Sequence, residues 1–322
     1  MKSSISARGS VLGAARKERC LALALLLWAL FVFAACADES KSGQKAAGSF
    51  AALPALRESS LDFYKIGKSP KDEWKLPNRL NEISGLATTQ DRRLFAHNDE
   101  RGILYEIDTD DGDILKSFHL GKEGIKADFE GITVVEESFF LVTSKGTLYE
   151  TVEGADDEEV KYVTYDSGVG DVCEVEGLEY EPDDRTLLLA CKTTRGSRLK
   201  DGIAIFRWSL DKHALLEPNF IWVSEDEIRR HLPQKHFHPS GIARHPTSKT
   251  YFVISAREHA LIEITPSGTI VDAKDLKEGR HPHAEGIAFS LRKSGALDLM
   301  ISDEGDDRRA RIARYRDRSV KK

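Results

Sequence analysis

A short motif ending in Gly-Ile or Gly-Leu occurs five times along the chain, and it constrains the fold more than any other feature. Its copies are residues 82–86 (EISGL), 128–132 (DFEGI), 174–178 (EVEGL), 238–242 (HPSGI) and 283–287 (HAEGI). The glycines of successive copies lie 46, 46, 64 and 45 residues apart. A repeat of about forty to fifty residues is the length of one four-stranded propeller blade. The motif therefore predicts an all-β, single-domain β-propeller in which each copy opens the innermost strand of a blade.

Each copy of the motif is followed by segments with the character of further strands. Short apolar or β-branched runs separated by turns follow the second copy at residues 131–135, 138–143 and 147–150. A strand-like segment at residues 61–66 precedes the first copy, and we expect this N-terminal strand to pair with the last blade and close the ring. This interpretation gives five blades. Six blades are the alternative, because residues 61–80 and the helix-compatible insertion at residues 225–232 fit no repeat.

The first 36 residues have the features of an export signal. Five basic residues precede an apolar run at residues 21–35, which is short for a membrane span. The run leads into FAAC at residues 33–36, which resembles the lipobox of bacterial lipoproteins, with Phe33 in place of the usual Leu. The resemblance implies that Cys36 is lipidated and becomes the mature N-terminus. An ordinary secretory signal cut after Ala35 is the alternative.

The export signal predicts a lipid-anchored protein of the cell envelope that contacts the membrane through its N-terminal lipid. Residue 37 is Ala rather than Asp, which by the lipoprotein sorting rule favours the outer membrane over the inner one. Residues 37–60 are rich in Ala, Ser, Gly and Lys, and we expect a flexible tether there. The propeller domain is expected at residues 61–316, followed by a basic tail at residues 317–322.

The charge of the exported chain narrows the choice of partners. Without the first 36 residues the chain has 42 Lys and Arg against 52 Asp and Glu, a formal net charge of −10. An acidic body without a basic stripe disfavours nucleic acid and is compatible with metal cations. We expect a monomer that binds a small anionic ligand or another envelope protein.

Two cysteines belong to the expected propeller, and export places them where disulfides persist. Cys173 and Cys191 lie on consecutive expected strands, at nearly opposite places across the turn at residues 181–185. A disulfide and a pair of buried free thiols are both open alternatives.

The residues just before the repeated glycines are the strongest candidates for a site. The residues directly before the glycines are Ser84, Glu130, Glu176, Ser240 and Glu285. The residues three positions before the glycines are Glu82, Asp128, Glu174, His238 and His283. Residues two apart on an extended strand face the same way, so these side chains should form two rings at one mouth of the channel. Six carboxylates that close must raise their pKa values, find basic partners or bind a cation.

A divalent cation is one way to satisfy the six carboxylates, which are Glu82, Asp128, Glu130, Glu174, Glu176 and Glu285. Ca²⁺ takes six to eight oxygen ligands, which carboxylates and water supply. The imidazoles in the same rings would also suit Mn²⁺ or Zn²⁺.

The ends of the second strands add further charged residues to the same mouth. They are Asp99, Lys145, Lys192, Arg257 and Glu304, with His97 and Asp303 beside them. Two interpretations stay open. Either the cations neutralise the carboxylates in a structural ion-pair network, or a metal ion occupies the acidic side and the basic side receives an anionic group such as phosphate. In the second case, hydrolysis would use a metal-activated water or one of the histidines His97, His238 and His283 as base.

The chain resembles the SdiA-regulated family of bacterial envelope propellers. The resemblance rests on residues 82–87 (EISGLA), 95–108 (FAHNDERGILYEID) and 128–133 (DFEGIT), and it extends over most of residues 60–316. It implies a propeller fold and an envelope location rather than a particular chemistry. More distantly, the architecture is similar to calcium-dependent propeller hydrolases of the lactonase, paraoxonase and phytase types, but a shared fold alone does not establish activity.

Two hypotheses of function follow from these residues. The first is a non-catalytic envelope module that binds a ligand or partner through the loop face of the propeller. The second is a metal-dependent hydrolase of an ester, a lactone or a phosphoester. The sequence leaves open whether the protein is an enzyme.

Overall fold

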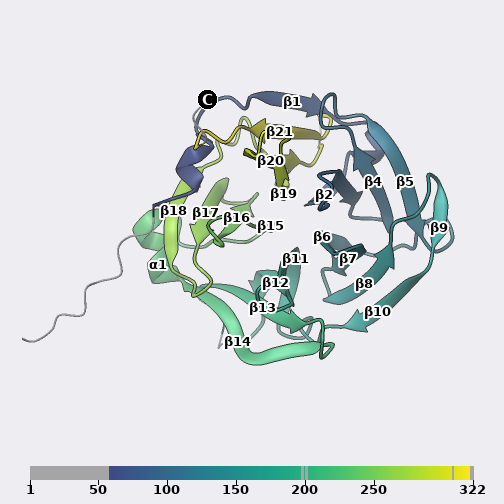
Figure 1. Cartoon of the computed structure of the whole chain (residues 1–322). Coiled ribbons are helices and arrows are strands. Elements are labelled where there is room, and N and C mark those ends of the chain that lie inside the picture. Colours follow the sequence, from purple (N-terminus) through teal and green to yellow (C-terminus); the bar gives the residue numbers. More distant parts are fainter. Residues whose placement is uncertain (1–57, 197–198, 200–201, 307, 320–322) are drawn as a thin grey trace, which may run out of the picture. The chain divides into compact units, whose positions relative to one another are not determined.

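Five antiparallel sheets surround a common centre in the computed structural model (Figure 1). The structure describes residues 58–196, 199, 202–306 and 308–319. The expected export signal with Cys36, and nearly all of the expected tether, lie outside these residues. No helix of the described part is long and apolar enough to cross a membrane.

The first three sheets follow the chain in order from the centre outward. The first contains β2 (Ile83–Thr88), β3 (Leu94–Asn98), β4 (Ile103–Ile107) and β5 (Ile114–Leu120), with β9 (Glu158–Val160) added in parallel beside β5. The second contains β6 (Phe129–Val135), β7 (Ser138–Thr143), β8 (Thr147–Val152) and β10 (Tyr162–Asp166). The third contains β11 (Cys173–Glu181), β12 (Thr186–Thr194), β13 (Gly202–Ser209) and β14 (Ala214–Ser224).

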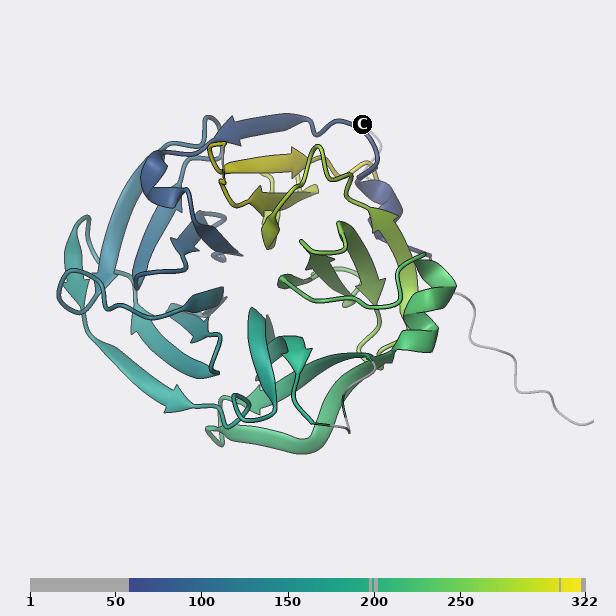
Figure 2. The ribbon, with the colours of Figure 1, turned by 180° about the vertical axis from the view of Figure 1, so that it is seen from behind.

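The last two sheets complete the propeller of five blades that the repeat predicts. The fourth contains β15 (Gly241–Arg244), β16 (Tyr251–Ser255), β17 (Ala260–Ile264) and β18 (Ile270–Asp275). The fifth contains β19 (Ala284–Leu291), β20 (Leu297–Asp303), β21 (Arg311–Tyr315) and β1 (Asp72–Lys75). Figure 2 shows from behind that the innermost strands gather at the centre, and each of them carries or directly follows a copy of the motif.

The N-terminal segment differs from the sequence prediction. Residues 61–66 do not form a strand: Leu61–Phe63 is a 3₁₀ helix, η1, and a turn follows it. The reason is the spacing of the apolar side chains, since Leu61 and Tyr64 lie one helical turn apart and are both buried against the fourth and fifth blades. The outermost strand of the fifth blade is instead β1, with Asp72 opposite Arg314 of β21.

The remaining helices lie in connections. η2 (Asn78–Leu80) leads from β1 into the first blade, and α1 (Glu225–His231) fills the long step between the third and fourth motifs. Ser224 caps α1 by accepting a hydrogen bond from the Glu227 amide at 3.2 Å. The helix-compatible insertion predicted at residues 225–232 is therefore a short helix, which packs through Ile228.

The apolar core is divided among the gaps between blades. One buried cluster lies between each pair of neighbouring blades, and Phe95, Phe118 and Phe139 form the aromatic centre of the one between the first two. Blades packed face to face in this way leave only their innermost edges to define the central channel.

Candidate functional site

The repeated glycines let the five inner strands approach each other around the channel. A Cβ atom on Gly131 would lie 2.7 Å from the Leu178 backbone nitrogen, and one on Gly241 would lie 2.6 Å from the Glu285 carbonyl oxygen. Each glycine therefore fits against the inner strand of the next blade. The free space at this level is about 10 Å³, no more than one water occupies. The glycines therefore narrow the channel directly beside Glu130 and Glu285.

In four of the five blades, a β-bulge in the inner strand lies at the residue before the glycine. The strand register shifts beside Gly85, Gly131, Gly177 and Gly286, and β15 begins only at Gly241. A bulge bends the strand and re-aims a side chain. These residues were expected to be regular strand, and the motif does not reveal the bulges, because a bulge depends on the partner strand.

Three glutamates before the glycines interact at the mouth. Glu130 accepts a hydrogen bond from the Ser84 hydroxyl at 3.4 Å, and Glu176 accepts one from the Lys192 ammonium group at 2.9 Å. Burial and the charge of Glu176 raise the pKa of Glu130 to about 9, and the same two causes raise the pKa of Glu285 to about 8. Burial also raises the pKa of Glu176, although Lys192 opposes this effect. The mouth holds more carboxylate than its bases neutralise.

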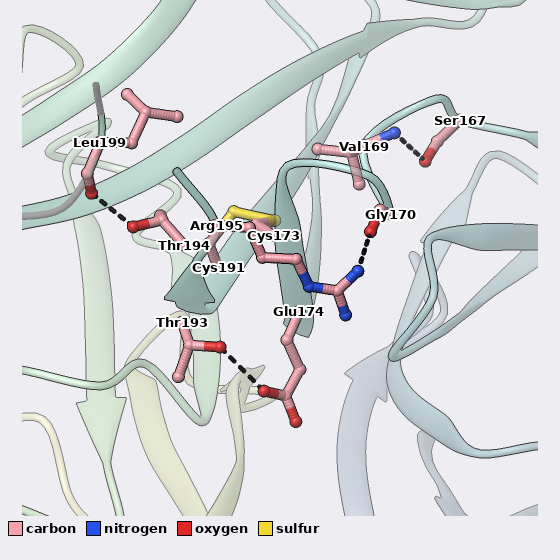
Figure 3. Close-up of a disulfide and its surroundings, with 10 residues drawn as sticks. All are labelled: Ser167, Val169, Gly170, Cys173, Glu174, Cys191, Thr193, Thr194, Arg195 and Leu199. Carbon is pink, nitrogen blue, oxygen red and sulfur yellow. Dashed lines mark hydrogen bonds between the residues drawn. A yellow bond between two sulfur atoms is a disulfide. The ribbon is translucent and has the colours of Figure 1, made fainter. Parts of the chain in front are cut away.

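The carboxylates three positions before the glycines lie further out. Asp128 is exposed and accepts a hydrogen bond from the Ser144 hydroxyl, while Glu174 accepts one from Thr193 at 2.9 Å, as Figure 3 shows. Among the described residues, no group of three or more His, Cys, Asp and Glu side chains stands ready to hold a metal ion. The six carboxylates are therefore not one preformed cluster, and the Ca²⁺, Mn²⁺ or Zn²⁺ site stays a prediction.

A second acidic group lies on the side of the first and fifth blades. Burial and the charges of Glu82 and Glu304 raise the pKa of Asp99 to about 6. Burial raises the pKa of Glu304 as well, with His283 opposing it. One carboxylate oxygen of Asp99 is buried without a hydrogen-bond partner in the described part of the chain. This side of the mouth is therefore also short of positive charge.

Of the three expected cations, Lys192 alone has an ion pair with a mouth glutamate among the described residues. Lys145 and Arg257 are exposed. Arg257 contacts the His238 ring at 3.3 Å, and the other nitrogen of that ring lies 2.8 Å from Glu258. The sequence analysis missed Glu258, which stands in a turn outside the motif. A fully neutralising ion-pair network is thus absent from the described structure.

Two expected ligand residues are buried away from solvent. His97 is fully buried, its Nδ1 lies 2.9 Å from the Asn98 carbonyl oxygen, and burial lowers its pKa to about 4. Its Nε2 fills the space where Gly85 lacks a side chain. Asp303 is also buried and is hydrogen-bonded to His281 at 2.7 Å. These contacts give both residues a structural role beneath the mouth.

Cys173 and Cys191 form a disulfide with a Cα–Cα distance of 5.7 Å (Figure 3). It joins β11 to β12 directly beside Glu174, Lys192 and their partners. The bridge therefore holds together the two strand ends that carry the Glu176–Lys192 ion pair and the hydrogen bond from Thr193 to Glu174.

A hollow of about 260 Å³ extends outward from Lys192 toward α1. Its polar lining consists of Lys192, Thr193, Thr194, Glu225, His236 and His238. The two threonines and His236 lie outside the motif positions and were not predicted. The mouth therefore has an acidic centre and, beside it, a hollow that combines ammonium, hydroxyl and imidazole groups with the carboxylate of Glu225.

The family model for SdiA-regulated proteins matches residues 71–304, which include all five motif copies. The chain belongs to the SdiA-regulated family. No curated protein matches the chain in sequence. Within this SdiA-regulated protein, the matched segment contains every candidate residue of the mouth, whereas β21 lies beyond it.

Several solved structures are similar to this SdiA-regulated propeller at low identity, and only the first of the three named here has a TM-score above 0.5. Glutaminyl cyclase from Myxococcus xanthus has 15% identity and a TM-score of 0.53, covering 77% of this chain and 95% of that one. Virginiamycin B lyase from Staphylococcus aureus has 14% identity and a TM-score of 0.39, covering 76% and 73%. Aldose sugar dehydrogenase from Streptomyces coelicolor has 12% identity and a TM-score of 0.45, covering 77% and 99%. At these identities the likeness concerns architecture alone.

Proposed function

We propose that this SdiA-regulated propeller is a non-catalytic binding module of the cell envelope, anchored by a lipid on Cys36. Its acidic mouth binds a divalent cation, and the adjoining hollow receives an anionic group of the ligand or partner. The supporting observation is the surplus of buried carboxylate: Glu130 and Glu285 have pKa values raised to about 9 and about 8, with Lys192 as the nearby cation. Buried carboxylates that repel one another are stabilised by a cation between them.

Calcium fits this proposal best, because carboxylate oxygens and water are its preferred ligands and its coordination geometry is flexible. Glu130, Glu176 and Glu285 would provide the protein oxygens. Since no preformed cluster exists in the described part, binding requires these flexible side chains to turn toward one ion. The affinity should therefore be modest, because side-chain ordering accompanies binding.

The state of two of the three candidate bases, His97 and His238, favours binding over catalysis. A general base needs a free nitrogen within reach of its proton. His97 is buried and has a lowered pKa, and both ring nitrogens of His238 contact charged neighbours. A metal-dependent hydrolase would have to rely on metal-bound water without either of these bases.

Thermal unfolding with and without metal tests the cation. Ca²⁺, Mn²⁺ and Zn²⁺ are added in turn to the metal-free protein. The wild type should melt at a higher temperature with Ca²⁺, and the double variant Glu130→Gln with Glu176→Gln should lose this rise. The control carries Glu137→Gln with Glu278→Gln, which removes two exposed carboxylates elsewhere. Absence of a response to all three metals in the wild type would refute the cation site.

Two further measurements test the remaining parts of the proposal. Labelled fatty acid should be incorporated by the wild type and not by Cys36→Ala. A panel of esters, lactones and phosphoesters should show no turnover. Metal-dependent turnover that the double glutamine variant abolishes would replace the binding role with the hydrolase.

A further inference from the structure

A second hollow, of about 670 Å³, lies on the opposite face of the fifth blade from the acidic mouth. Its walls come from residues 64–71, 292–296 and 315–318. β19 starts beside Glu285 at the mouth and ends at Leu291, so the turn that follows it stands at the other face. β21 runs in the same direction as β19, because both strands pair antiparallel with β20. The C-terminal end of β21 therefore lies at the same face as the end of β19.

Hydrogen bonds between the three walls build this hollow. The Lys71 amide donates to the Arg314 carbonyl oxygen at 2.8 Å, which fixes the N-terminal wall to β21. The Asp317 amide donates to Asp298 at 3.2 Å, and the Leu297 amide donates to Asp317 at 3.3 Å. The C-terminal wall is thereby fixed to the start of β20. These hydrogen bonds fix the walls of the hollow relative to one another.

The lining of this hollow is strongly basic in a protein whose exported chain is acidic. Its cations are Lys65, Lys71, Arg292, Arg316 and Arg318. Its single lining carboxylate, Asp317, already accepts hydrogen bonds from the Leu297 amide and from Ser319. In the described part of the chain, Lys65 and Arg318 have no ion-pair partner within 4.0 Å.

The other three cations of the hollow share two carboxylates, Asp72 and Asp298. Lys71 and Arg316 lie 3.5 and 3.8 Å from Asp72. Asp72 is already held by two hydrogen bonds from the Arg314 guanidinium group, at 2.5 and 2.9 Å. Arg292 stands 3.1 Å from Asp298, but its Nε makes no aligned hydrogen bond within the described residues. Positive charge therefore exceeds negative charge throughout the hollow.

We propose that this basic hollow binds a phosphate ester group. A phosphate carries up to two negative charges and several acceptor oxygens, which matches convergent guanidinium and ammonium groups. A single carboxylate would satisfy one arginine and leave most of the lining uncompensated. Pro70 is half-buried and gives the lining an apolar part for the organic group of the ester, with the buried rings of Tyr64 and Tyr315 behind it.

The phosphate can come from a lipid headgroup or from a soluble ester. The N-terminal wall begins at Tyr64, 28 residues after Cys36. The tether expected at residues 37–60 would, as a random coil, let those 28 residues span about 30 Å and so bring a bilayer within reach. The lipid source rests on the proposed anchor, whereas the phosphate chemistry does not depend on it.

Calorimetric titration of the full chain in a neutral detergent tests the phosphate site. The probes are inorganic phosphate, glycerol 3-phosphate, and short-chain phosphatidylglycerol and phosphatidylcholine. The test variant carries Lys65→Gln with Arg318→Gln, and the control carries Lys122→Gln with Lys235→Gln, which removes two exposed cations elsewhere. Thermal unfolding of both variants verifies that they are folded. The test variant should bind glycerol 3-phosphate or phosphatidylglycerol at least about tenfold more weakly than the wild type, because two charge-assisted contacts are lost.

The outcome distinguishes the sources. Binding of phosphatidylglycerol in preference to glycerol 3-phosphate supports the site with a lipid headgroup as occupant, and the reverse preference supports it with a soluble ester. Equal affinity of the test and control variants for every probe overturns the proposal, as does absence of binding to the wild type. None of these results depends on the lipid at Cys36, so failure of the anchor would leave the test intact.

Discussion

Replacing Glu130 by Gln should stabilise the protein at neutral pH, although it alters the candidate site. Glu130 stands in the mouth beside other carboxylates, and its pKa is raised from 4.5 to about 9. The folded protein therefore keeps a proton on Glu130 that the unfolded chain has already lost. Glutamine imitates the protonated form at every pH and can still accept the hydrogen bond from Ser84.

The size and sign of this effect follow from proton linkage. The stability that Glu130 contributes is fully present below pH 4.5 and is lost as the pH rises toward 9. At pH 7 the difference between folded and unfolded pKa values has lowered the free energy of unfolding by at most roughly 3 kcal/mol. The gain of Glu130→Gln should thus be near zero at about pH 4.5, reach up to roughly 3 kcal/mol at pH 7, and grow further to about pH 9.

Urea unfolding in the presence of EDTA measures this gain across the pH range. The chelator removes divalent cations, which would otherwise stabilise the ionised mouth. Glu137→Gln, at an exposed position, is the matched control and should show little dependence on pH. A destabilising effect of Glu130→Gln at pH 8, or an equal gain in the control, would refute the assignment of Glu130 as a buried, repelled carboxylate.

Three further predictions concern the frame of the site. Gly131→Ala should destabilise the protein by about 1–3 kcal/mol or more in urea unfolding, because its Cβ would meet a backbone nitrogen at 2.7 Å; Gly67→Ala, with nothing within 4 Å, should change little. Replacing both Cys173 and Cys191 by Ser should lower the unfolding free energy by about 2–4 kcal/mol, and reduction of the wild type should reproduce this loss. Lys192→Met should destabilise by about 1–3 kcal/mol at pH 8 and by less at pH 5, because its buried glutamate partner can take up a proton at low pH. A pH-independent loss would contradict that ion pair.

The sequence predicted the blades because blade packing depends on local pattern. The glycine of each motif lies against the inner strand of the next blade, and that contact recurs in every blade; at Gly85 the His97 ring of the same blade adds a second close contact. The prediction of a strand at residues 61–66 was wrong because this segment belongs to no repeat. Its apolar side chains pack between the fourth and fifth blades. In so short a run, the sequence does not distinguish a buried strand from a buried helical turn.

The sequence predicted which glutamates lie together at the mouth, but it predicted less well how the candidate residues are buried and hydrogen-bonded. Glu130, Glu176 and Glu285 do interact at the mouth, as their repeated positions indicate. The burial of His97 and the engagement of Asp303 by His281 depend on strands brought in from elsewhere. No motif carries that information.

By itself, the sequence determined that this protein is a propeller with carboxylates beside its central glycines, because a repeat imposes the same contact on every copy, and the structure decided between five blades and six in favour of five. The tertiary structure decided the charge balance of those carboxylates. Burial, repulsion between the neighbouring carboxylates and the opposing charge of Lys192 set their pKa values, and each of these depends on distances between blades. The basic hollow likewise exists only in the folded chain, since its cations come from the two ends of the propeller domain and from one turn between them.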